Sequence, residues 1–287
     1  MSQGDGPTNR LLTLTRASWL PLTLRKKLAR LLPVQAGHRF RLPLFEGTFL
    51  GITGTLIDDK VWRYGLHEAA TIRLMRRLLA DDRRAGRVPV LLDVGTNTGV
   101  HLVACAGLCD AALGCEPWAP MRHRAEASLA ASGFHHVRLL PCGLGEATAQ
   151  LPFSVPQGTN LGTGSFATGQ GELMAQVRRG DEICAEEGLL PTLVKIDTEG
   201  FELPVLRGLS EVLRTAQPAV VFEVGGTAAE RAETVRAVSA LLGDGYRLFG
   251  LRRSLEQPWL FPLRPGARCE NALAWPLRRG PQPPRGG

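Results

Sequence analysis

The amino-acid sequence predicts an α/β fold: a doubly wound sheet with helices on both of its faces, preceded by a small N-terminal cap of strands and helices. Two observations support this prediction. From residue 88 to about residue 253, apolar segments typical of strands alternate with segments that have the spacing of helices. The strands, such as "VPVLLDV" and "AVVFEV", are apolar along their whole length, as parallel strands buried on both faces usually are.

The elements of this region follow one another in a regular order. The expected strands are "VPVLLDV", "AALGCE", "HHVRLLPCGL", "AQLPFSVP", "TLVKIDT", "AVVFEV", "YRLFGLRR" and a last strand in "NALAWPL". The expected helices are "GVHLVACAGL", "PMRHRAEASLAASG", "ELPVLRGLSEVLRTA" and "AAERAETVRAVSALLG". A glycine-rich segment, "NLGTGSFATGQG", is expected to be a loop between strands.

The N-terminal third divides into an arm and a cap. Residues 1–38 form a basic arm, in which "TNRLLTLTRASWLPLTLRKKLAR" contains no acidic residue. The arm could lie on a membrane surface, act as a transit peptide or dock on the domain. Docking on the domain is favoured over the other two, because Pro21 and Pro33 interrupt any long amphipathic helix. Residues 39–87 are expected to form the cap, with a β-meander over 39–64 and then a helix in "GLHEAATIRLMRRLLADD".

The main domain is expected at residues 88–277, and a disordered tail at 278–287. The net charge of +7 permits anionic partners without naming one. Nucleic acid is not expected, because aromatic residues make up only 6% and no basic run is interleaved with them. No C-x-x-C pair occurs, so a structural zinc site is not expected. Most of the six cysteines lie inside apolar runs, so we expect a reduced, cytoplasmic protein. No apolar run reaches about 18 residues, so no transmembrane segment is expected. The sequence indicates no particular oligomeric state.

Two strand ends carry the residues of a cofactor site. The first strand ends in "DVGTNTG", where Gly95 and Gly99 allow a tight turn and a close approach of the backbone to a ligand. Asp93 offers a carboxylate to a cationic group of that ligand. Glu116 follows the second strand, a position suited to accept hydrogen bonds from both hydroxyls of a ribose. These positions predict a cofactor that contains a nucleoside.

The spacing of the glycines favours one cofactor over another. The dinucleotide fingerprint G-x-G-x-x-G needs a glycine where this chain has Asn97. S-adenosylmethionine has a ribose, an ammonium and a sulfonium but no phosphate, so it suits an acidic glycine turn better. An NAD(P)-dependent oxidoreductase or epimerase and a non-catalytic cofactor-binding module remain the alternatives.

The stretch "KIDTEGFE" places three carboxylates at the end of a buried strand. Asp197 lies at the strand tip, where it could act as a general base, and Glu199 beside it is a second candidate catalytic residue. Together with Glu199, Glu202 or Glu223 it could instead bind a divalent cation such as Mg²⁺ through hard oxygen ligands. Glu202 starts the following helix, so it is either a substrate contact or a helix-start charge with no chemical role.

The histidines and the glycine-rich loop give further candidates. His67 is a candidate catalytic acid or base, or else an ordinary group at a helix start. His101 and His123 are expected on helix surfaces. Asn160 and Ser165 of the loop are candidate substrate contacts, unless the loop is a plain mobile connector.

An ordered set of stretches resembles the FkbM-type S-adenosylmethionine-dependent methyltransferases. They are "LLDVGTNTG", "GCEP", "HHVRLLPCGLGE", "GTNLGTGSF", "LVKIDTEGFELPVLRG" and "AVVFEV", and the resemblance covers roughly residues 62 to 250. It implies a class I methyltransferase-like, Rossmann-like fold with a seven-stranded sheet. It also implies O-methylation of a sugar or natural-product scaffold, so the expected partner is a small-molecule or glycosylated substrate in natural-product biosynthesis.

The resemblance also implies roles for individual residues. The residues implied at the methionine end of the cofactor are Asp93, Gly95, Asn97 and Gly99. Glu116 is implied at the ribose, and Gly143 is a further implied cofactor contact. The family signature falls on Asp197, Glu199, Gly200 and Glu202. The chain departs from the family at Thr96, Thr98, Cys115 and Thr198. These departures weaken any inference of a shared substrate more than they weaken the inference of a shared cofactor.

Overall fold

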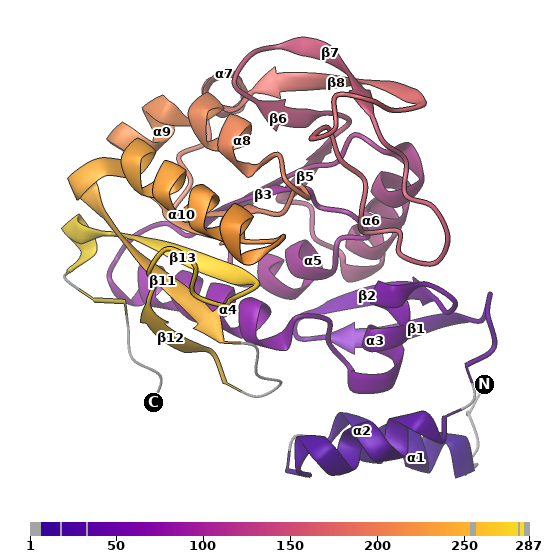
Figure 1. Cartoon of the computed structure of the whole chain (residues 1–287). Helices are drawn as coiled ribbons and strands as arrows, with labels where there is room; N and C mark the ends of the chain where they lie inside the picture. Colours follow the sequence, from indigo (N-terminus) through magenta and orange to yellow (C-terminus); the bar gives the residue numbers. More distant parts are fainter. Residues whose placement is uncertain (1–6, 18, 33, 253–256, 281, 284–287) are drawn as a thin grey trace.

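The computed structural model describes residues 7–17, 19–32, 34–252, 257–280 and 282–283. The main sheet has eight strands in the order β12-β11-β13-β10-β9-β3-β4-β5 (Figure 1). Their bounds are β3 (Val90–Val94), β4 (Ala111–Cys115), β5 (Val137–Leu140), β9 (Leu193–Ile196), β10 (Ala219–Glu223), β11 (Tyr246–Arg252), β12 (Trp259–Pro262) and β13 (Asn271–Pro276). Strands β5, β4, β3, β9 and β10 pair in parallel, whereas β13 runs antiparallel between β10 and β11. The predicted α/β fold is therefore confirmed.

The main sheet has one strand more than the seven that the family resemblance implies. The additional strand, β12, pairs with β11 at the edge and contains Pro262. This short run follows Pro258 and is not among the strands expected from the sequence. Proline is tolerated at an edge because no further strand needs its missing N–H group.

The order of the strands fixes where a ligand can bind. From β3 the chain continues to β4 and β5 on one side, and later returns to place β9 and β10 on the other side of β3. The direction of winding therefore reverses between β3 and β9. In open α/β sheets, ligands bind beyond the carboxyl ends of the strands at such a switch point.

A second, three-stranded sheet was only partly predicted. It consists of β6 (Gly143–Gly145), β8 (Leu173–Arg179) and β7 (Ala149–Phe153), in that spatial order. The expected strand "HHVRLLPCGL" is divided into β5 and β6, because Pro141 between them cannot donate a ladder hydrogen bond. The strand expected in "AQLPFSVP" is β7 and belongs to this sheet, and β8 was missed.

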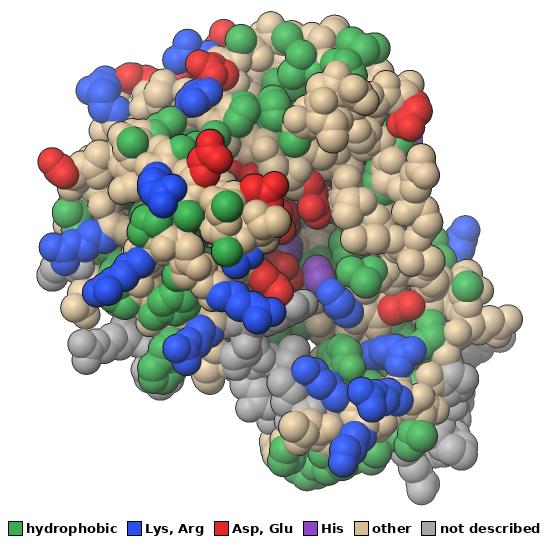
Figure 2. All heavy atoms as spheres, in the orientation of Figure 1, with side chains coloured by type: hydrophobic (Ala, Val, Ile, Leu, Met, Phe, Trp, Pro, Cys, Tyr) green, Lys and Arg blue, Asp and Glu red, His purple; other side chains and the backbone are tan. Residues whose placement is uncertain are grey.

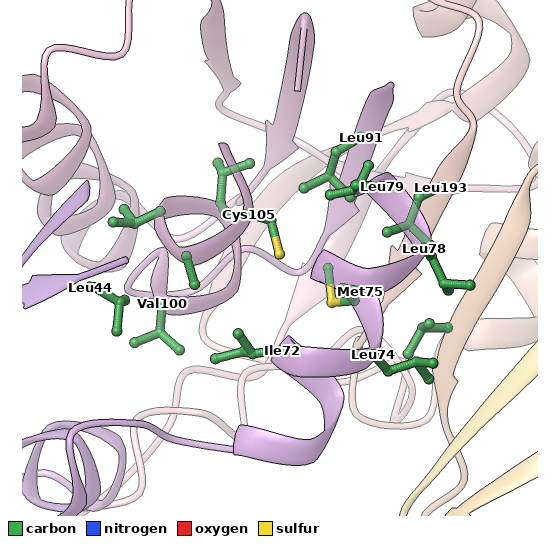
Figure 3. Packing of buried hydrophobic residues seen from close by; sticks show 14 of the residues in the cluster. Leu44, Ile72, Leu74, Met75, Leu78, Leu79, Leu91, Val100, Cys105 and Leu193 are labelled. Atoms are coloured by element: carbon green, nitrogen blue, oxygen red, sulfur yellow. The ribbon is translucent and has the colours of Figure 1, made fainter. Parts of the chain in front are cut away.

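Helices cover both faces of the main sheet, as expected. One face packs against α4 (Ala69–Arg84), α5 (Val100–Ala106) and α6 (Ala119–Ser132), and the other against α7 (Gly180–Glu186), α8 (Glu202–Gly208), α9 (Ser210–Thr215) and α10 (Ala228–Leu242). Leu91 and Leu193 point toward α4, where they meet Met75 and Leu78 (Figure 3). Their sequence neighbours point to the opposite core, because side chains alternate along a strand.

The cap is part strand and part helix. Strands β1 (Arg39–Leu44) and β2 (Gly47–Ile52) form an antiparallel hairpin, but α3 (Leu56–Tyr64) is a helix where the β-meander was expected to continue. The meander prediction is thus wrong over residues 56–64. Thr55 caps the helix by accepting a hydrogen bond from the Asp58 N–H, and Gly65 ends it at φ 80°.

Both ends of the chain contain helical segments. The arm contains α1 (Pro7–Arg16) and α2 (Leu22–Arg30), and Arg16 docks it on the cap by donating a hydrogen bond of 3.0 Å to the Trp62 carbonyl. A 3₁₀ turn, Leu277–Arg279, opens the segment expected to be a disordered tail, of which residues 281 and 284–287 lie outside the described part. Among the described residues, every helix is too short or too polar to cross a bilayer.

Candidate active site

A cavity opens beyond the carboxyl ends of β3, β4, β9 and β10, at the switch point of the sheet. Its walls come from the turn 94–98, residues 116–118, Lys195 and the loop 197–199, Glu223, the cap helix α3 and the loop 160–166. Figure 2 shows a hollow near the centre of the molecule, where acidic and histidine side chains gather. Of the residues predicted for the site, Gly95, Asn97, Glu116, Gly143, His67, Asn160, Ser165, Asp197, Glu199 and Glu223 line the cavity.

The glycine turn packs directly against the acidic loop. Gly95 has φ 78°, and a Cβ atom at this position would lie 1.8 Å from the carbonyl oxygen of Asp197. Any larger residue would therefore push the two loops apart. Gly99 has φ 82° and lies outside the cavity wall, where a Cβ atom would come within 2.8 Å of the Ala125 side chain. Gly95 thus joins the predicted cofactor turn to the predicted catalytic loop, while Gly99 allows the turn to pack on α6.

Glu116 is held firmly at the end of β4. Its two carboxylate oxygens accept hydrogen bonds from the backbone N–H groups of Asn97, at 2.9 Å, and Trp118, at 2.8 Å. Burial raises the pKa of Glu116 to about 7, although these two hydrogen bonds act in the opposite direction. The carboxylate is thus oriented by the backbone before any ligand arrives.

Lys195 lies at the centre of a buried charge cluster on β9. Its Nζ atom is 3.1 Å from Asp197 Oδ2 and 3.6 Å from Asp93 Oδ1. Burial acts to lower the pKa of Lys195, but the charges of Asp197, Asp93 and Glu68 outweigh it and raise that pKa. The ammonium therefore stays charged and anchors Asp197.

Asp93 is not in the cavity wall. It is fully buried beside Lys195, and its oxygens accept no hydrogen bond from any residue that the structure describes. The charged group next to it is the ammonium of Lys195. This placement favours an indirect role, in which Asp93 helps Lys195 to hold Asp197.

Three carboxylates crowd the opposite side of the cavity. Asp197, Glu199 and Glu223 each offer an oxygen within 4.8 Å of the others. Burial and the neighbouring negative charges raise the pKa of Glu199 to about 7 and that of Glu223 to about 9. Such a group either shares protons at neutral pH or binds a divalent cation, since carboxylate oxygens are the ligands that Mg²⁺ prefers.

Glu202 and Ser165 hold the acidic loop in shape. Glu202 accepts three hydrogen bonds of 3.1 Å, from the Thr198 N–H, the Thr198 hydroxyl and the Gly200 N–H, and it does not line the cavity. Ser165 lines the cavity but donates its hydroxyl to the carbonyls of Thr198 and Glu199. These contacts support the left-handed conformation of Glu199, at φ 52°.

His67, Glu68 and His101 form a second group of polar side chains in the cavity wall, near the starts of α4 and α5. Of these three, only His67 was predicted as a site residue. Burial lowers the pKa of His67 to about 4, so its imidazole in the cavity wall is neutral at pH 7. Glu68, at φ 49°, lies 3.4 Å from His101 Nε2 and accepts a hydrogen bond from Asn271. Burial opposes ionisation of Glu68, yet the neighbouring His101, His67 and Lys195 lower its pKa well below the usual range.

The expectation that His101 lies on a helix surface is wrong. His101 is buried and lines the cavity, because every residue of the short helix α5 is enclosed by the sheet, α4 and the cap. His123 is exposed, as expected. Glu68 was not among the predicted site residues, and the only sequence signal for it was an acid next to His67 at the start of a helix.

The glycine-rich loop lies across the mouth of the cavity. The Asn97 side chain donates a hydrogen bond of 3.0 Å to the Leu161 carbonyl, and the Leu56 N–H donates one of 2.9 Å to the Thr159 carbonyl. The loop is thus attached both to the glycine turn and to the cap. Asn160, predicted as a substrate contact, lines the cavity from this loop.

Comparison with known proteins gives one family and a group of related folds. The model of the methyltransferase FkbM domain matches residues 93–248. A methyltransferase FkbM from Methylobacillus flagellatus KT aligns at 19% identity with a TM-score of 0.45, over 65% of this chain and 43% of that chain. A SAM-dependent methyltransferase from Agrobacterium tumefaciens aligns at 13% identity with a TM-score of 0.50, over 84% of this chain and 71% of that chain.

The sequence matches none of the curated proteins with which it was compared. At these identities, the similarity to solved structures indicates a shared fold, that of class I S-adenosylmethionine-dependent methyltransferases. The chain spans less than half the length of the FkbM protein from Methylobacillus flagellatus.

Proposed function

Because the chain belongs to the FkbM methyltransferase family, we propose that it transfers a methyl group from S-adenosylmethionine to a hydroxyl oxygen of a sugar or natural-product scaffold. One observation supports this proposal above the others. The glycine turn, Glu116 and the three crowded carboxylates line a single cavity at the switch point of the sheet.

The residues of the cavity fit the groups of this cofactor. Glu116 lines the wall with its carboxylate already oriented, so two ribose hydroxyls can donate to it without a rearrangement. The Trp118 ring lies next to it in the wall and offers an apolar face to an adenine. The acidic side of the cavity favours the positive charges of the sulfonium and ammonium groups.

When bound, the cofactor supplies a methyl group on a sulfonium centre that is open to in-line attack. The chain must then orient the acceptor hydroxyl, exclude water and accept the hydroxyl proton. We assign proton acceptance to Glu199, because a general base works best when its pKa lies near the working pH, and the pKa of Glu199 is about 7. Lys195 fixes Asp197 beside it, and the loop 160–166 covers the mouth.

Asp197 and the neutral His67 are further candidates for the general base. In a version with a metal ion, the three carboxylates would instead bind Mg²⁺, which would lower the pKa of the acceptor hydroxyl. Exhaustive dialysis against a chelator separates these versions. Activity that survives chelation excludes the cation, whereas activity that is lost and then restored by Mg²⁺ assigns the three carboxylates to metal binding.

Equilibrium dialysis of the full chain against S-adenosylmethionine and, separately, against NAD⁺ tests the choice of cofactor. We expect binding of S-adenosylmethionine alone, followed by formation of S-adenosylhomocysteine when a panel of hydroxylated sugars and natural products is added. Preferential binding of NAD⁺ would contradict the proposal in favour of an oxidoreductase. Cofactor binding without turnover on any acceptor would favour a non-catalytic binding module.

A further inference from the structure

The N-terminal arm is a docked helical pair, and its outer face is not covered by any of the residues that the structure describes. Helices α1 and α2 lie at one end of the molecule, beyond the hairpin and α3 (Figure 1). Leu12, Ala29 and Leu32 are buried on the inner side, and Arg25 joins the two helices by donating a hydrogen bond of 2.7 Å to the Thr15 carbonyl. The arm is thus part of the fold, and its outer face has a defined orientation.

Exposed large apolar side chains are concentrated in the arm. The described residues include eleven exposed large hydrophobic side chains, and four of them lie between residues 14 and 31. These four are Trp19 at 75% exposure, Leu31 at 69%, Leu24 at 42% and Leu14 at 36%. Leu24 and Leu31 are seven positions apart, with the half-buried Leu28 between them, so they form one stripe along α2. Exposed apolar groups gathered in this way mark an interaction surface.

Basic side chains lie beside this stripe and are not neutralised. Lys26, Lys27 and Arg30 are exposed on α2 and form no ion pair with any residue in the described part of the chain. Lys26 and Lys27 are two of only four lysines in the protein, and the sequence has no acidic residue between Asp5 and Glu46. Figure 2 shows this end of the molecule with several basic side chains close to hydrophobic ones.

We propose that the arm docks on the surface of an anionic lipid bilayer. Separate apolar and basic stripes on one short helix are the arrangement by which amphipathic helices lie in the membrane interface. Trp19 and the leucine stripe would enter the boundary between headgroups and acyl chains, where tryptophan is enriched. Lys26, Lys27 and Arg30 would remain among the anionic headgroups.

The arm and the cavity are joined by the cap helix α3, so docking of the arm would bring α3 toward the bilayer. Helix α3 contacts α1 through the hydrogen bond from Arg16 to the Trp62 carbonyl. Leu56, Ile57 and Lys60 of the same helix line the cavity. The docking proposal does not depend on the proposed function, because it concerns only the arm.

Flotation of the full chain with lipid vesicles tests the proposal. One vesicle is pure phosphatidylcholine, and the other contains about 30% phosphatidylglycerol, both at about 0.15 M salt. We expect the partition coefficient to be at least about tenfold higher on the anionic vesicles, since each basic residue near such a surface contributes about fivefold. Equal binding to both vesicles, or no flotation, would overturn the proposal.

Two pairs of variants separate the apolar and the basic contributions. Trp19→Ser with Leu31→Ser, and separately Lys26→Glu with Lys27→Glu, should each lower the partition coefficient at least about tenfold. The matched controls are Trp259→Ser with Leu190→Ser, which are similarly exposed at 65% and 71%, and Arg264→Glu with Arg268→Glu, which are exposed elsewhere.

The controls should leave binding unchanged, and all four variants should keep the far-ultraviolet circular dichroism of the wild type. An equal loss in control and arm variants would overturn the proposal. So would a concentration-dependent dimer that Trp19→Ser with Leu31→Ser abolishes, because the apolar stripe would then bind a second copy of the chain.

Discussion

The two sides of the cavity use carboxylates in opposite ways. On the β3–β4 side, Glu116 is alone, and two backbone N–H groups fix both of its oxygens. On the β9–β10 side, three carboxylates lie within 4.8 Å of one another, with the one ammonium of Lys195 next to Asp197. Each oxygen of Glu116 is oriented by one backbone donor and keeps a lone pair for a ligand, whereas the three crowded carboxylates raise one another's pKa values and are suited to exchange protons or bind a cation. The comparison predicts that substitutions on the first side change binding, and those on the second side change the rate.

The largest effect is expected for Glu199→Gln. Loss of a general base costs 10²-fold or more, so kcat should fall by at least about 10²-fold while the Kd for S-adenosylhomocysteine, which lacks the sulfonium charge, changes less than about threefold. Single-turnover kinetics with radiolabelled cofactor, together with equilibrium dialysis, measure the two quantities. Glu233→Gln, an exposed carboxylate on α10, is the control and should change neither. A Kd that rises in proportion to the loss of rate would remove the distinction between the two sides.

The next largest effect is expected for Glu116→Gln. The Kd for S-adenosylmethionine should rise more than about tenfold, because charge-assisted hydrogen bonds to the ribose contribute roughly 1.5–3 kcal/mol. The single-turnover rate at saturating cofactor should stay within a few-fold of the wild type. Unchanged cofactor affinity would defeat the ribose assignment of Glu116.

The crowded carboxylates also predict how stability depends on pH. Burial and mutual repulsion raise the pKa values of Glu199 and Glu223 above their ordinary value of 4.5, so the folded chain binds more protons than the unfolded chain. Their stabilising contribution is fully present below pH 4.5 and is lost as the pH rises through about 7 and then about 9. The free energy of unfolding, measured with urea in the presence of a chelator, should therefore fall between pH 6 and pH 9.

Glu223→Gln tests this pH dependence directly. The amide resembles the protonated acid at all pH values, so the variant should gain stability over the wild type as the pH rises from 4.5 to 9, by at least about 1–2 kcal/mol. The two proteins should differ least at pH 4.5 and below. Parallel stability curves for wild type and variant would contradict the assignment of a raised pKa to Glu223.

The smallest effect is expected for Ser165→Ala. The hydroxyl donates to two carbonyls of the acidic loop, and its loss should cost about 1 kcal/mol locally. We expect a severalfold loss of rate and faster amide hydrogen exchange confined to residues near Thr198 and Glu199. The conservative variant Ser165→Thr, which keeps the hydroxyl, should restore both values. Unchanged exchange would mean that the loop does not depend on this residue.

The fold and the outline of the site could be predicted from sequence for one reason. Runs such as "VLLDV" and "AVVFE" are apolar on both faces, so they must be central strands, and the carboxyl ends of parallel strands meet at one edge. Asn97, Glu116, Asp197 and Glu223 therefore come together whatever the details of the helices.

The remaining features depend on backbone conformation and packing that leave little trace in sequence. Glu68 and Glu199 adopt left-handed φ values that no residue preference would assign to them. Glu202 resembles a reactive acid in sequence, and only the conformation of the loop shows that its oxygen accepts three hydrogen bonds. His101 sits on a helix enclosed on all sides, so no periodic pattern distinguishes its cavity side from an exposed one.

The most direct test of the two-sided cavity is a crystal structure of the chain with bound S-adenosylhomocysteine. We expect the ribose hydroxyls to lie within hydrogen-bond distance of Glu116 and the sulfur atom to face Asp197 and Glu199. A product bound elsewhere, or one whose ribose lies among the three crowded carboxylates while its sulfur points toward Glu116, would contradict both assignments.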